Sequence, residues 1–125
     1  MKLSLRHIIY YRVLLFINLV VITYLATTSL EIAVVSSIYD KINHFVAFLV
    51  LSLLLDFSFP NSRFNTAKIY SLLMYGCLIE IIQHFLPHRM FSLFDIAADS
   101  LGLLAYGLLI PFIKRLPAFS DRWSN

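Results

Sequence analysis

The chain has 125 residues, of which 60% are hydrophobic and 14% are charged, and its mean hydropathy is +0.82. Soluble domains carry roughly 25% charged residues, so this composition excludes an ordinary soluble domain and indicates an integral membrane protein. The length suits one domain, residues 1–125. The net charge is only +3, and no basic stripe alternates with exposed aromatics, so no nucleic-acid partner is expected.

The first predicted helix covers about residues 10–30. Three basic residues precede an apolar run that begins at Val13, an arrangement that resembles a signal peptide. However, the run has about 18 residues, whereas a signal core has roughly 7–15, and no clear cleavage site follows it. We therefore expect a retained transmembrane helix.

The second predicted helix, about residues 40–58, has polar residues in its first turn: Asp40, Lys41 and His44. With its flanks the apolar run is long enough to cross the ~30 Å of bilayer hydrocarbon. The Asp40 carboxylate suits a helix N-terminus, where it would cap free N–H groups. Capping does not explain Lys41 or His44. Asp56, near the other end of this helix, is interpreted as an interfacial residue.

A polar turn follows, and Asn65 or Thr66 is predicted to cap the third helix, about residues 67–86. Pro87 separates it from the fourth helix, about residues 92–113, so these two helices are expected to form a tight hairpin. An ionisable side chain at a membrane helix centre costs roughly 2.5–3.5 kcal/mol. The several ionisable residues of this hairpin therefore need partners or a function. The predicted fold is an all-α integral membrane bundle of four transmembrane helices.

The basic residues orient this bundle. Eight of the ten lie at one set of helix ends: Lys2, Arg6, Arg12, Arg63, Lys68, Lys114, Arg115 and Arg122. Only Lys41 and Arg89 lie at the other. Because basic residues concentrate on the cytoplasmic side, we expect both termini in the cytoplasm and the loops at about 31–40 and 86–92 outside.

The unusual polar residues then gather at the outer side. Within each helix they follow the spacing that places side chains on one face: Lys41 with His44, Glu80 with Gln83, and Asp95 with Asp99. Three polar faces at one level predict a lipid-shielded, outward-facing cleft. Carboxylates outnumber the lysine and arginine there, so at least one carboxyl is expected to be protonated or to face a bound cation, unless His44 is charged.

Two motifs carry a family resemblance. The first is D-K-x-x-H-F, which begins at Asp40. The second comprises Gly76, Glu80, Gln83, Phe85, Pro87, Arg89, Ser92, Asp95, Ala98 and Gly102. In order and spacing, over about residues 13–113, the chain resembles the VanZ-like family of small bacterial membrane proteins. It departs from the pattern at Asp99, where the family usually has Asn. The resemblance implies a four-helix protein of the bacterial inner membrane and a link to glycopeptide (teicoplanin-type) resistance.

The first functional hypothesis is an outward-facing site that binds or acts on an amphiphilic cell-envelope molecule. Membrane lipids, an envelope lipid or a peptidoglycan precursor are the expected partners. Arginine suits phosphate or carboxylate recognition because its fork is bidentate. His44 and Glu80 are the candidate catalytic acid or base. The candidate ligand-binding residues are Asp40, Lys41, Gln83, Arg89, Asp95 and Asp99. Catalysis stays open, and no cofactor or oligomeric state is assigned.

The second hypothesis is a structural or partner-binding scaffold in which the same charges form an ion-pair clasp. A conduction pathway is disfavoured because Val46–Leu55 and Leu103–Ile110 contain almost no polar residues. His44, Glu80 and Asp95 are metal ligands by type, but they lie far apart in the sequence. No metal is assigned on this basis.

Overall fold

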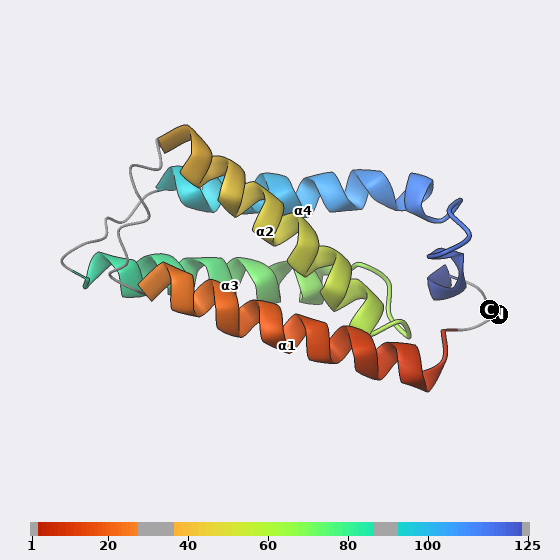
Figure 1. The fold of residues 1–125 in the computed structure, drawn as a ribbon. Coiled ribbons are helices and arrows are strands. Elements are labelled where there is room, and N and C mark those ends of the chain that lie inside the picture. The colour runs from red at the N-terminus through yellow and green to blue at the C-terminus, as the bar shows by residue number, and fades with distance from the viewer. Residues whose placement is uncertain (1–2, 28–36, 87–92, 124–125) are drawn as a thin grey trace.

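The structure is a computed structural model that describes residues 3–27, 37–86 and 93–123. Its helices are α1 (Leu5–Thr27), α2 (Ser37–Ser58), α3 (Thr66–His84), α4 (Leu93–Ile113) and the short 3-10 helix η1 (Ser120–Trp123). The described residues contain no strand, which confirms the all-α prediction. The four long helices lie side by side in one bundle (Figure 1). The start of α1, the α2–α3 turn and the end of α4 share one end of it (Figure 1).

Three stretches of the described residues are long and apolar enough to cross a membrane: Leu5–Thr27, Lys41–Ser58 and Leu93–Ile113. The 19-residue helix α3 is not among them, but it lies beside the others and completes the bundle. Large apolar side chains cover the outside, among them Met74 and Phe94, which are 69% and 76% exposed. A soluble monomer rarely exposes so much contiguous apolar surface, whereas lipid covers it in a bilayer. The chain is therefore a membrane protein.

The helix starts follow local capping chemistry. α1 begins at Leu5, earlier than the predicted residue 10, because Ser4 initiates it: the Ser4 hydroxyl accepts the His7 N–H at 3.4 Å. α3 begins at Thr66 after the N-cap Asn65, whose side chain accepts the Lys68 N–H at 3.3 Å. This contact confirms the predicted cap. The hairpin at Pro87 lies outside the described residues.

The core lies between α2, α3 and α4. Its most buried members are Phe48, Leu51, Leu72 and Leu103. Gly102 permits the close approach of α4 to α2, because a Cβ built there would lie 2.5 Å from the Phe45 carbonyl oxygen. Small residues at such crossings are typical of membrane helix packing. α2 and α4 make the most extensive contact in the bundle, and this contact positions the polar residues of both helices.

Candidate functional site

Five of the predicted site residues meet at one end of the bundle. They come from three helices: Lys41 and His44 from α2, Glu80 from α3, and Asp95 and Asp99 from α4. We call this group the His44 cluster. All three carboxylates are buried, and Glu80 is fully buried. Residues that are distant in sequence therefore form one compact ionisable group within an apolar bundle.

The His44 ring lies between two carboxylates of α4. Its Nδ1 is 2.8 Å from Asp99 Oδ1, and its Nε2 is 3.5 Å from Asp95 Oδ2. The other Asp95 oxygen forms an ion pair with Lys41 Nζ. An ionised Asp99 carboxylate can only accept, so Nδ1–H donates to it while Nε2 faces Asp95. Asp99 thus fixes the orientation and the tautomer of His44.

Glu80 reaches the same point from α3. His44, Glu80 and Asp95 each offer one ligand atom, and these three atoms lie within 4.8 Å of one another. Gly76, one turn earlier on α3, leaves room for the neighbouring carboxylate. A Cβ built on Gly76 would lie only 2.8 Å from Asp99 Oδ2. The absence of a side chain at Gly76 therefore allows α3 and α4 to approach at this level.

The remaining predicted residues are placed differently or not described. Gln83 turns to α1, where its amide donates to the Ala26 carbonyl oxygen at 3.1 Å. Its described role is thus a link between α3 and α1. Arg89 and the Asp40 side chain lie outside the part of the chain that the structure describes.

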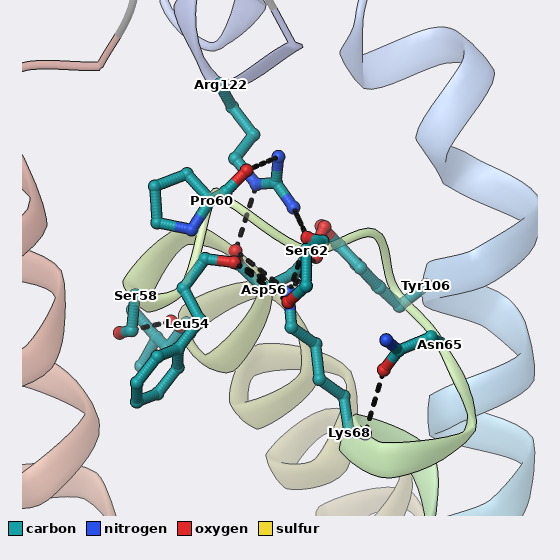
Figure 2. Close-up of polar contacts among 10 residues, drawn as sticks. Leu54, Asp56, Ser58, Pro60, Ser62, Asn65, Lys68, Tyr106 and Arg122 are labelled. Carbon is teal, nitrogen blue, oxygen red and sulfur yellow. Dashed lines mark hydrogen bonds and ion pairs between the residues drawn. The ribbon is translucent and has the colours of Figure 1, made fainter.

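A second polar cluster, which the sequence did not predict, lies at the opposite end of α2. Asp56 is fully buried at its centre, so its interpretation as an interfacial residue is wrong. Asp56 Oδ1 accepts from Lys68 Nζ at 2.8 Å and from Arg122 at 2.7 Å, and Oδ2 accepts from Tyr106 OH at 2.6 Å (Figure 2). We call these four residues the Asp56 cluster. A buried carboxylate is tolerated in the bundle because three donors surround it.

The cations of the Asp56 cluster also hold the α2–α3 turn. Arg122 donates to the Asp56, Pro60 and Ser62 carbonyl oxygens at 2.9, 3.0 and 2.7 Å (Figure 2). Lys68 donates to the Ser62 carbonyl oxygen at 3.0 Å. Arg122 lies on η1, which therefore fastens the C-terminal segment to the bundle. The one sequence signal was the isolated carboxylate of Asp56 in an apolar helix, since such a group needs a buried partner.

An apolar groove lies between α3 and α4. Its volume is about 430 Å³, and its lining includes Leu73 of α3 and Ser100, Leu104 and Gly107 of α4. Ser100 directly follows Asp99 of the His44 cluster. The groove thus lies between two of the three helices that form the His44 cluster, and it extends from Ser100 toward the α2–α3 turn, where Phe64 also lines it.

A yeast relative, an uncharacterized protein of Schizosaccharomyces pombe, is 40% identical over an alignment of 82 residues that covers 62% of this chain. The aligned part is 51% of the yeast protein, so the chain spans about half of that relative's length. Because this relative is not bacterial, the bacterial origin stays a prediction. No solved structure matches the chain significantly.

The family model described as VanZ/LLP1 matches residues 3–114. The match includes all of α1 to α4 and every residue of the His44 cluster, whereas Arg122 lies beyond it. Nearly the whole chain is covered, and the predicted VanZ-like resemblance is confirmed. The chain belongs to the VanZ/LLP1 family.

Proposed function

We propose that this membrane protein binds an amphiphilic molecule whose polar head lies at the His44 cluster. One observation carries the proposal: five ionisable side chains from three helices meet at one end of a bundle whose outer surface is apolar. Burying such groups in a membrane is costly, so ionisable groups inside a bundle indicate a functional site by default. The head of a ligand would gain contacts that the surrounding lipid cannot offer.

The cluster provides both recognition and acid–base chemistry. The Lys41 side chain is 32% exposed, and its cation would attract an anionic head such as a phosphate or carboxylate. The His44 side chain is 16% exposed, and an imidazole can both donate and accept a proton, as acid–base chemistry requires. The apolar groove between α3 and α4 offers space for the tail of the same ligand. These features support binding and leave any reaction unassigned.

The proposed ligand is a cell-envelope molecule, and the proposed location is the cytoplasmic membrane with the His44 cluster facing outward. The charge distribution supports this orientation, since eight of ten basic residues belong to the other side. Single cysteines at Asn61 and Ser36, in a Cys77→Ala background, test it with an impermeant thiol reagent on intact cells. Labelling at position 36 is expected. Labelling at position 61 without labelling at position 36 would indicate the opposite orientation.

The alternative is a structural clasp in a scaffold protein. Its support is the Lys41–Asp95 ion pair, which joins α2 to α4. A clasp needs hydrogen bonds at position 44 but no titratable ring, because Asn fills similar space and also donates and accepts. The two functions therefore differ in what they require of His44.

His44→Asn distinguishes them. We expect this variant to keep its expression, monodispersity and melting temperature, yet to abolish the cellular phenotype. Susceptibility to a lipid-tailed glycopeptide of the teicoplanin type is the phenotype to measure first. His84→Asn is the matched control, since His84 is exposed on α3 near the same end of the bundle. A fully retained phenotype in His44→Asn, or a loss that only follows loss of folded protein, would favour the clasp.

A further inference from the structure

We propose that the His44 cluster is a divalent-metal site in which His44, Glu80 and Asp95 are the protein ligands. The metal site goes beyond the proposed function, because it requires only the geometry of the cluster and no amphiphilic ligand. In this site the three residues, which are far apart in the sequence, act together as metal ligands. Each comes from a different helix, so bound metal would cross-link α2, α3 and α4 at one point.

The distances suit a metal centre. His44 Nε2 and Asp95 Oδ2 are 3.5 Å apart. Two ligands at about 2.1 Å from a tetrahedral Zn²⁺ are separated by about 3.4 Å, so this pair already has the spacing of a common cation. The Glu80 carboxylate completes a triangle of ligand atoms that all lie within 4.8 Å of one another. A small side-chain adjustment of Glu80 would close the triangle around an ion.

A second feature is the carboxylate that supports His44 on the other side of the ring. Histidine ligands usually donate the ring N–H remote from the metal to a carboxylate, which fixes the tautomer and makes the ligand more basic. Asp99 occupies this place, with its Oδ1 at 2.8 Å from His44 Nδ1. Gly76 leaves the room that Asp99 needs, since a Cβ there would lie 2.8 Å from Asp99 Oδ2. This pairing supplies the carboxylate–histidine part of a carboxylate–histidine–metal arrangement.

The donor set indicates the kind of metal. One imidazole nitrogen and two carboxylate oxygens suit Zn²⁺ and similar divalent transition metals better than Ca²⁺ or Mg²⁺, which prefer oxygen ligands alone. Three protein ligands leave a fourth position open, as in catalytic rather than structural zinc sites. Lys41 pairs with Asp95 Oδ1, and His44 Nε2 lies 3.5 Å from Asp95 Oδ2, so Oδ2 is the oxygen offered to the proposed metal. We therefore assign the site to a zinc-like cation with one open position.

The test uses the full chain in detergent, purified without a histidine tag and treated with a chelator. Titration with Zn²⁺ alone is followed by calorimetry and elemental analysis, and Co²⁺ is added as a visible probe of coordination. We expect about one Zn²⁺ per chain and an intense Co²⁺ absorption typical of low coordination number. His44→Asn and Glu80→Gln should each weaken Zn²⁺ binding by at least about 100-fold. Asp99→Ala, which changes a positioning residue, should weaken it by about 10–100-fold and retain the Co²⁺ band.

The chain's four histidines permit a complementary control that leaves the His44 cluster unchanged. The triple variant His7→Asn/His84→Asn/His88→Asn retains His44 as the only histidine. It should bind Zn²⁺ like the wild type and show imidazole nitrogen coupling when loaded with Cu²⁺. No binding by the wild type, unchanged affinity in His44→Asn, or loss of binding in the triple variant would each overturn the metal site. Because the titration uses Zn²⁺ alone and no cell-envelope molecule, failure here leaves the proposed function to be judged by its own phenotype test.

Discussion

The two polar clusters lie at opposite ends of α2 and differ in how their charges are satisfied. The Asp56 cluster has one carboxylate and three side-chain donors, and its cations also bind backbone carbonyl oxygens of the α2–α3 turn. The His44 cluster has three carboxylates with one lysine and one imidazole. Its described contacts run from side chain to side chain across helices. The Asp56 cluster binds the C-terminal segment to the α2–α3 turn. The His44 cluster instead brings several possible metal-ligand atoms close together.

The binding partners and the exposure of the charged side chains distinguish a structural cluster from a ligand-binding cluster in this bundle. Cations that bind backbone carbonyls hold one loop conformation and leave little capacity for a ligand. Asp56 and Arg122 are both buried, so a ligand in solution or in the bilayer has little access to them. Lys41 and His44 stay partly exposed, at 32% and 16% of their side-chain surfaces. We therefore attribute stability to the Asp56 cluster and binding to the His44 cluster, and the predictions below can break or sharpen that division.

The largest effect is expected at Asp56. Asp56→Asn keeps the shape of the side chain but leaves Lys68 and Arg122 buried without a counter-charge. Removal of one partner from a buried ion pair typically costs about 3–5 kcal/mol, so the melting temperature in detergent should fall steeply. Asp121→Asn, at a less buried aspartate of η1, is the control and should have little effect. If Asp56→Asn melts at the same temperature as the wild type, the Asp56 cluster does not stabilise the fold.

An intermediate effect is expected from Gly76→Ala. The added methyl group would meet Asp99 Oδ2 at 2.8 Å and the Phe48 ring at 3.2 Å. Overpacking of this kind costs roughly 1–3 kcal/mol, and it should also weaken Zn²⁺ binding because Asp99 is displaced from His44. Gly107→Ala is the control, since no atom lies within 4 Å of the added Cβ. If the two variants melt alike, the close approach at Gly76 is not a packing constraint.

The smallest effect is expected between Lys41 and Asp95. Because the Lys41 side chain is about one-third exposed, solvent screens the pair. A double-mutant cycle with Lys41→Met and Asp95→Asn, measured with chelator present, should give a coupling energy of roughly 0.5–1 kcal/mol. A coupling energy as large as the stability loss expected for Asp56→Asn would instead indicate that the His44 cluster is a structural clasp.

Much of the candidate site followed from local patterns. The polar residues of α2, α3 and α4 at the His44 end were predicted to converge, because helical spacing and helix direction bring them to one level. The structure adds that Gln83 bonds to α1 and that Gly76 makes space for Asp99. The Asp56 cluster was missed, since Arg122 lies beyond α4 and no spacing rule links it to Asp56.

The sequence by itself determined the membrane class, the four helices with their approximate bounds, and the polar residues of α2, α3 and α4 that lie near one end of the bundle. These properties depend on hydropathy and on periodicity within one helix, which act over a few residues. Only the tertiary structure decided that His44 lies between Asp95 and Asp99, and that Arg122 returns to Asp56. Such contacts depend on how helices rotate and cross, and that is set by packing at points such as Gly102 between segments distant in the chain.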